Sequence, residues 1–207
     1  MNEELEALLM KCTRLLEDFK YEEAEKELKI AVSLSPNHPE VWDLLGTCYL
    51  FLNKMGDAER AYRRAMELDP SVSKYWHSLG STLGHLNQFE AAESCLRKAL
   101  EIGPETSRSW SSLASSLLNQ NRYDEALEAT QKAVQIDTAS FDAYFTMSLA
   151  HFYKGQMDEA ERSMKKVVEI APRLTQAWEV LAEIYKRKGQ AQEAENALKR
   201  IDELRDQ

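Results

Sequence analysis

Histidine and cysteine are the side chains of this chain best suited to acid–base, nucleophilic or metal chemistry. The four histidines do not form the His-Glu-x-x-His spacing that places two zinc ligands on one helical face; they are His38, His77, His85 and His151. The three cysteines have no metal-ligand spacing and no matched histidine; they are Cys12, Cys48 and Cys95. We therefore expect no metal, no cofactor and no enzymatic activity.

Glycine and charge patterns exclude further functional classes. The run Gly80-Ser-Thr-Leu-Gly84 lacks the lysine and the spacing of a phosphate-binding loop. The formal net charge is −9, and residues 1–72 hold 9 basic and 15 acidic side chains. An acidic chain is poorly suited to phosphate backbones or anionic membrane surfaces, so neither nucleic acid nor membrane is an expected partner.

Compartment can be predicted from the cysteines and from the distribution of apolar residues. Three unpaired thiols are typical of a reducing compartment. The sequence begins Met-Asn-Glu-Glu-Leu-Glu, without the basic start and apolar run of a signal peptide. It also has no apolar run of 18 residues that could span a membrane. These features predict a cytoplasmic protein.

A repeat of 34 residues organises the whole sequence. Trp42, Trp76 and Trp110 are 34 residues apart, and Tyr144 and Trp178 continue the series. The repeat predicts a single array over residues 1–207, in six units without insertions: 5–38, 39–72, 73–106, 107–140, 141–174 and 175–207. A fixed period of this length indicates stacked supersecondary units with one continuous core.

Each unit carries the signals of two helices and a tight turn. The twentieth position is alanine in all six units, as close helix packing requires: Ala24, Ala58, Ala92, Ala126, Ala160 and Ala194. The fifteenth position is Asn or Gly in five units, and these residues accept the left-handed conformation that ends a helix. Phe19 takes this position in the first unit, where the turn signal is weaker. Proline at the thirty-second position of four units ends the second helix.

Taken together, these residues resemble the tetratricopeptide repeat family, whose pattern is Trp-x2-Leu-Gly-x2-Tyr followed by Ala, an aromatic residue, Ala and Pro. The second unit matches it fully, through Trp42, Leu45, Gly46, Tyr49, Ala58, Tyr62, Ala65 and Pro70. The resemblance implies an all-α fold, an α-solenoid of six helix-turn-helix units forming a right-handed superhelix. It also implies a protein-binding role, with the first helix of each unit lining a concave groove.

The resemblance assigns particular side chains to that groove. The predicted peptide-binding residues are Lys74, His77, Ser81, Arg108, Ser111, Ser115, Asn119, Phe145, Leu149, Phe152 and Tyr153. Phe145, Leu149, Phe152 and Tyr153 form an apolar stripe in addition to the packing stripe of the same helix, which predicts a hydrophobic pocket. Packing of these aromatic rings against neighbouring first helices stays open as an alternative. For the polar residues, simple solvation is the corresponding alternative.

Two ligand signatures of the family are absent. The carboxylate clamp needs Lys at the fifth and Asn at the ninth position of one unit, and no unit has either residue there. The asparagine ladder of sugar-transferase superhelices, expected at the sixth position, is also missing. The sequence therefore favours an adaptor that binds a protein or peptide segment. The alternatives are a scaffold that self-associates, for example through Leu198, Ile201 and Leu204, and a regulatory subunit of a larger complex.

Overall fold

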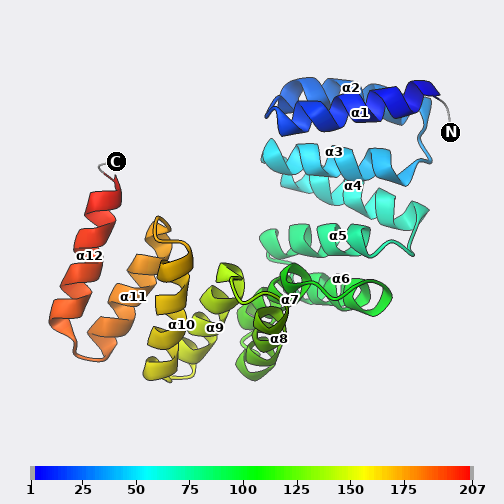
Figure 1. Cartoon of the computed structure of the whole chain (residues 1–207). Coiled ribbons are helices and arrows are strands. Elements are labelled where there is room, and N and C mark those ends of the chain that lie inside the picture. The colour runs from blue at the N-terminus through cyan, green and yellow to red at the C-terminus, as the bar shows by residue number, and fades with distance from the viewer. Residues whose placement is uncertain (1–2, 206–207) are drawn as a thin grey trace. The chain divides into compact units, whose positions relative to one another are not determined.

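The computed structural model describes residues 3–205, which form twelve α-helices and no strand (Figure 1). The helices in chain order are α1 (Glu3–Glu17), α2 (Tyr21–Leu34), α3 (Pro39–Phe51), α4 (Met55–Leu68), α5 (Ser73–His85), α6 (Phe89–Ile102), α7 (Ser107–Asn119), α8 (Tyr123–Ile136), α9 (Phe141–Tyr153), α10 (Met157–Ile170), α11 (Thr175–Arg187) and α12 (Ala191–Arg205). The predicted all-α, helical-repeat fold is confirmed.

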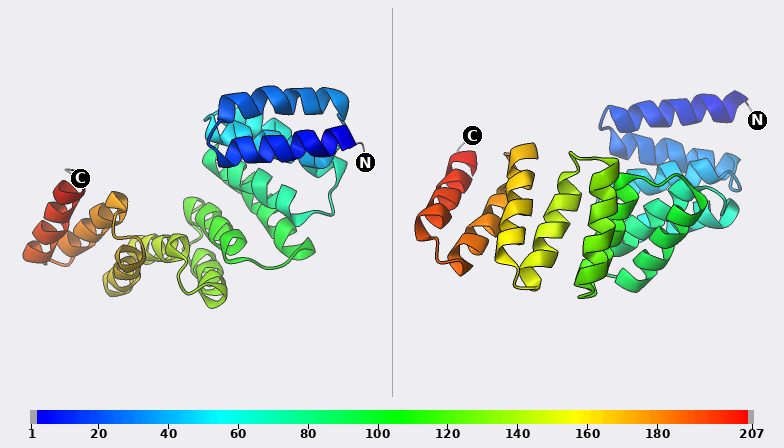
Figure 2. Two further views of the ribbon diagram at one scale, coloured as in Figure 1. Left: turned by 45° about the horizontal axis from the view of Figure 1, so that its top comes forward. Right: turned by 60° about the horizontal axis from the view of Figure 1, so that its bottom comes forward.

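Three-residue turns join the two helices of every predicted repeat unit. The middle residue of each turn has a positive φ: 57–60° at Phe19, Asn53, Asn87 and Asn121, and 74–76° at Gly155 and Gly189. A backbone hydrogen bond closes each turn, as in Lys54 N to Tyr49 O at 2.8 Å. Such short turns make the two helices antiparallel neighbours, and the views in Figure 2 show them side by side.

Three tryptophans of the repeat donate hydrogen bonds to the proline carbonyls of the preceding loops. The indole Nε1 of Trp42 donates to Pro36 O at 2.8 Å, and Trp76 donates to Pro70 O at 2.8 Å. Trp178 donates to Pro172 O at 2.9 Å. In these three repeat units the indole fastens the first helix to the loop that precedes it, and a backbone carbonyl of that loop gains a partner. Trp110 instead donates to Glu105 Oε2 at 3.2 Å.

Small residues allow the paired helices to pack closely. All six alanines of the twentieth position are at most 3% exposed. Gly46 of α3 faces Tyr62 of α4, and a Cβ atom on Gly46 would lie 2.7 Å from that ring. The ring has no free space to move into, because Tyr62 is 2% exposed and its hydroxyl lies 3.0 Å from Thr47 Oγ1.

The helices form two compact units, α1–α6 and α7–α12, divided between Pro104 and Glu105. We refer to them as unit 1 and unit 2. Each contains three of the predicted repeat units, so the division falls close to the predicted boundary at residues 106 and 107. A single array over residues 1–207, with one continuous superhelix, stays a prediction.

Of the three apolar residues predicted for self-association, Leu198, Ile201 and Leu204, only Leu198 is exposed. Ile201 is 3% exposed and packs inward in unit 2, whereas Leu198 is 40% exposed. Leu204 is half-buried. An exposed apolar side chain on α12 is thus provided mainly by Leu198.

We predict that Gly46→Ala destabilises unit 1 by about 1–3 kcal/mol, because overpacking forces the buried Tyr62 ring or the backbone to shift. Gly56→Ala on α4 is the matched control, since a Cβ atom there would meet nothing within 4 Å. The control should be neutral or stabilising by up to about 1 kcal/mol. Urea denaturation followed by circular dichroism measures both, and equal midpoints for the two variants would contradict the packing argument.

Candidate functional site

A pocket of about 350 Å³ lies between α7, α8 and α9 of unit 2. Its lining residues are Ser115, Leu118, Asn119, Asn121, Tyr123, Phe145, Thr146, Leu149 and Tyr153. Five of the predicted groove residues therefore come together in one cavity: Ser115, Asn119, Phe145, Leu149 and Tyr153. The volume is at the lower end of the range for small-ligand pockets and suits one or two amino-acid side chains.

Helical spacing brings the pocket residues onto common faces. Ser115 and Asn119 are four residues apart on α7, and Phe145, Leu149 and Tyr153 follow at the same spacing on α9. The pocket becomes more exposed toward its outer end, since Leu118 is 8% exposed and Thr146 7%, whereas Tyr153 is 58% exposed. An apolar side chain that enters would thus contact Phe145 and Leu149 beside a buried floor.

An aromatic pair forms the outer wall. The rings of Tyr123 and Tyr153 stack with centroids 5.6 Å apart and an interplanar angle of 20°. The hydroxyl of Tyr123 donates to Asn121 Oδ1 at 2.7 Å. On the facing helix, Asn119 Nδ2 donates to Ser115 O at 2.8 Å. These bonds orient the side chains of Asn119 and Asn121 at the rim.

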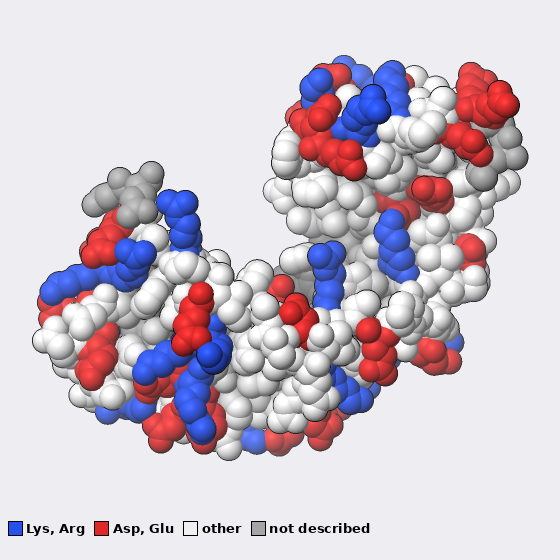
Figure 3. Space-filling model, viewed as in Figure 1, with Lys and Arg blue, Asp and Glu red and all other residues white. Residues whose placement is uncertain are grey.

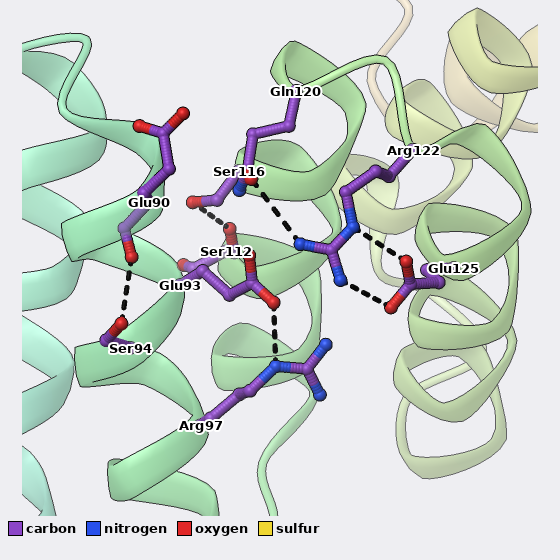
Figure 4. A network of polar contacts seen from close by, with 9 residues as sticks. All are labelled: Glu90, Glu93, Ser94, Arg97, Ser112, Ser116, Gln120, Arg122 and Glu125. Atoms are coloured by element: carbon purple, nitrogen blue, oxygen red, sulfur yellow. Dashed lines mark hydrogen bonds and ion pairs between the residues drawn. The ribbon is translucent and has the colours of Figure 1, made fainter.

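An arginine follows Asn121 in the turn between α7 and α8. The Nε and Nη2 atoms of Arg122 each lie 2.6 Å from one carboxylate oxygen of Glu125, and Nη1 lies 3.4 Å from Gln120 Oε1 (Figure 4). Figure 4 also shows the bond within α7 from Ser116 Oγ to Ser112 O, at 3.1 Å. Two parallel bonds to one carboxylate restrict the guanidinium strongly. The backbone N–H of Arg122 also bonds Leu117 O at 3.0 Å, which closes the turn between α7 and α8 just before Tyr123.

Phe152 lies outside the pocket although it was predicted to line the groove. It is 9% exposed and belongs to the hydrophobic core of unit 2 with Met164, Leu181 and Tyr185. The guanidinium of Arg187 on α11 lies 4.1 Å from the Phe152 ring centroid. The alternative of packing against a neighbouring first helix therefore describes Phe152, because α11 covers that side of α9.

The remaining predicted residues of unit 2 lie elsewhere on α7. Arg108 is exposed, and its charge lowers the pKa of Asp142, which burial raises by a larger amount. Ser111 is 6% exposed, with its Oγ 3.4 Å from Ser140 Oγ. Neither residue lines the pocket.

Lys74, His77 and Ser81 lie on α5 in unit 1. Lys74 Nζ is 2.5 Å from Oδ2 of Asp43 on α3, and Asp43 is 1% exposed. Among the described residues, Oδ1 of Asp43 has no hydrogen-bond partner. Burial raises the pKa of Asp43, and the lysine opposes that rise. Lys74 thus compensates a buried carboxylate, while His77 and Ser81 are half-buried.

Asn121 and Tyr123 were missed because the predicted groove used only the first helix of each repeat unit. Tyr123 is the first residue of a second helix and reaches the pocket by stacking on Tyr153 of the next repeat unit. The sequence held one signal for it, since the seventeenth position of the repeat is also aromatic at Tyr21 and Phe89.

The charge distribution, the possible metal ligands and the length of the helices bear on other kinds of site. On the face that Figure 3 shows, acidic and basic side chains are interspersed, with uncharged residues between them. Over residues 3–205, no group of three or more His, Cys, Asp or Glu side chains is arranged to hold a metal ion. None of the helices described is both long and apolar enough to cross a membrane.

The three cysteines are free and buried. Cys12 and Cys48 are fully buried, and burial raises the pKa of each thiol to about 11. Burial also raises the pKa of Cys95. Because the thiolate is the reactive form, these thiols are protected both by packing and by protonation.

We therefore predict that iodoacetamide at pH 8 leaves Cys12 and Cys48 unmodified in the folded protein and modifies both in urea. Mass spectrometry of the intact protein and of its peptides reports the sites. Rapid modification of either thiol without denaturant would contradict the burial described.

We predict that Lys74→Met lowers the free energy of unfolding by an amount that depends on pH. Without the ammonium group, the buried Asp43 carboxylate is unpaired, and we expect a loss of about 1–2 kcal/mol near neutral pH, less than for a fully buried pair because Lys74 is exposed. The folded state holds the Asp43 proton more tightly than the unfolded state, so ionisation weakens folding as pH rises through the raised pKa.

The loss of unfolding free energy caused by Lys74→Met should therefore become smaller as the pH falls through the pKa of Asp43, which lies above the usual value of 3.8. Urea denaturation at several pH values measures it. Asp43→Asn in the same background is the control and should remove the pH dependence. A cost that is constant with pH would contradict the ion-pair explanation.

Comparisons with known proteins agree with this fold. The model of the cilia and flagella-associated protein 70 C-terminal domain, a tetratricopeptide-repeat (TPR) family, matches residues 4–206. No curated protein matches the chain.

Among solved structures, PilW, a widely conserved type IV pilus biogenesis factor, is similar with a TM-score of 0.87 and 18% identity, over 95% of this chain and 91% of PilW. YrrB, described as a TPR protein with an unusual peptide-binding site, has a TM-score of 0.63 and 21% identity, over 86% of this chain and 91% of YrrB. The Cut9–Hcn1 hetero-tetramer of the APC/C contains a chain with a TM-score of 0.86 and 14% identity, over 97% of this chain and 40% of that one. These likenesses show the fold, and the matched family model shows that the chain belongs to the family of the cilia and flagella-associated protein 70 C-terminal domain.

Proposed function

We propose that this chain is a protein-binding adaptor that takes a segment of a partner protein into the pocket between α7, α8 and α9. The observation that supports the proposal is the composition of the lining. Phe145, Leu149 and Leu118 supply apolar surface, and the Tyr123–Tyr153 pair supplies a flat aromatic wall. Apolar side chains beside a few polar groups are the general form of a side-chain binding pocket.

The proposed ligand is an extended segment with one apolar or aromatic anchor residue. An anchor in the pocket would gain affinity by leaving water, and aromatic walls favour such anchors. Ser115, Asn119 and Asn121 at the rim offer hydroxyl and amide groups to the backbone of the same segment. The anchor in the unit 2 pocket would thus supply affinity, and the polar groups at the rim would set the register of the bound segment.

A binding role without catalysis fits the same residues. The lining contains serine, threonine, asparagine and tyrosine but no histidine, cysteine, carboxylate or basic side chain. A hydroxyl nucleophile needs a neighbouring base, and the lining offers none. The solved structures point in the same direction, because YrrB is described as having a peptide-binding site. Free, buried thiols agree with a cytoplasmic location.

Self-association is the second candidate, and Leu198 on α12 is the observation that favours it, being apolar and 40% exposed. One exposed leucine is a small surface for a stable dimer. Sedimentation at several concentrations separates the two functions, because an adaptor of the proposed kind is a monomer at all of them.

We predict that Phe145→Ala with Leu149→Ala weakens peptide binding about 10- to 100-fold, since both side chains line the pocket. A library of random twelve-residue peptides, selected on the unaltered protein, supplies the ligand, and fluorescence anisotropy measures its affinity. The helical circular-dichroism signal should be retained.

Leu198→Ala is the matched control, because it removes an exposed leucine of the same unit outside the pocket, and it should bind within about twofold. If every selected peptide binds the double variant as tightly as the unaltered protein, the pocket is not the binding site.

A further inference from the structure

Unit 1 has an exposed group of three aromatic rings, Phe19, Tyr21 and Phe51, which we call the unit 1 aromatic cluster. Tyr21 and Phe51 stack with centroids 4.6 Å apart and an interplanar angle of 8°. Phe19 contacts Tyr21 edge-on, with centroids 6.3 Å apart and planes at 86°. Phe19 is 77% exposed and Phe51 58% exposed, so most of this aromatic surface faces solvent.

Neither the backbone conformation nor the packing at position 19 favours a phenylalanine. Its φ is 60°, in the left-handed region that Asn and Gly occupy at the equivalent position of the other five repeat units. A phenylalanine with this backbone conformation is strained, because its Cβ crowds the neighbouring carbonyl oxygen. Burial does not compensate the strain, since the ring is the most exposed of the large apolar side chains described. A residue that costs stability and packs little indicates a role outside the fold.

Carboxylate residues adjoin the cluster in the sequence. Glu17, Asp18 and Glu22 are exposed, and none of them forms an ion pair within residues 3–205. Glu17 and Asp18 also lie at the C-terminal end of α1, where the helix dipole disfavours negative charge. Among the nearby basic residues, Lys29 and Lys54 both pair with Glu25, while Arg14 and Lys20 lie close to the cluster in the sequence. Residues 14–25 hold two basic and five acidic side chains, so the sequence around the cluster is net negative, as it is over residues 1–72.

The cluster occupies the same repeat positions as the outer part of the unit 2 pocket. Three repeat units separate Tyr21 from Tyr123 and Phe51 from Tyr153, and both pairs stack. Glu17 and Phe19 correspond in the same way to Asn119 and Asn121, which line the pocket. Unit 1 thus repeats the aromatic wall of unit 2, with a carboxylate and a phenyl ring in place of two amides.

We propose that the unit 1 aromatic cluster docks an arginine side chain from a basic segment of a partner protein. A guanidinium group stacks on aromatic faces and also pairs with carboxylates, and both kinds of surface are present here. The chain already uses this contact internally, since the Arg187 guanidinium lies 4.1 Å from the Phe152 ring centroid. This site is on the other unit from the pocket and is independent of the function proposed for it.

The test uses a fluorescein-labelled peptide of alternating arginine and glycine, measured by fluorescence anisotropy on the full chain. Phe51→Ala and Phe19→Asn should each weaken binding about threefold to thirtyfold. Phe19→Asn should at the same time leave the melting temperature unchanged or raise it, because asparagine suits the left-handed turn. Loss of binding without loss of stability distinguishes docking from a structural role.

Further variants test the role of charge and control for effects elsewhere in the chain. Lys20→Gln should tighten binding by removing a like charge, and replacing arginine with citrulline in the peptide should abolish it. Ile30→Ala removes another exposed apolar side chain of unit 1, 50% exposed, and should have no effect. Phe145→Ala with Leu149→Ala should also leave arginine-peptide binding intact, so failure here is distinguishable from failure of the unit 2 pocket.

Two results would overturn the proposal. One is equal binding of the arginine peptide by the unaltered chain, Phe51→Ala and Phe19→Asn. The other is a lysine–glycine peptide that binds as tightly as the arginine peptide, which would mean that general charge attraction explains the binding.

Discussion

Close approach of paired helices at small residues is the constraint on which the rest of this structure depends. The buried alanines of the twentieth position and Gly46 against Tyr62 set how near two helices can lie. Because the helices pack without intervening side chains there, large residues at other positions are left to face the next repeat unit or the solvent. The pocket in unit 2 and the aromatic cluster in unit 1 are both formed from such residues.

The turns and helix pairs could be predicted because each depends on local chemistry that recurs every 34 residues. Asn and Gly mark the left-handed turn residue directly. Phe19 adopts the same conformation without that signal, since the geometry of the repeat imposes it on an unfavourable residue. The division into two units between Pro104 and Glu105 lies close to one of the predicted repeat boundaries, but the 34-residue period continues across it and does not distinguish it from the others.

The pocket could be predicted in part. Phe145, Leu149 and Tyr153 share a face of α9 through helical spacing, which a sequence displays. Phe152 was assigned to the groove because periodicity does not show that α11 covers that side. Tyr123 was missed because its stacking on Tyr153 joins residues of different repeat units, and such contacts exist only in the folded chain.

The central claim is that a partner segment enters the pocket between α7, α8 and α9, and methyl NMR with labelled leucine tests it most directly. Addition of a selected peptide should shift the Leu118 and Leu149 methyl signals and give contacts from them to the peptide anchor. The buried Leu45 and Leu79 of unit 1 should be unaffected. Binding that leaves Leu118 and Leu149 unchanged and shifts leucines outside the pocket would contradict the account.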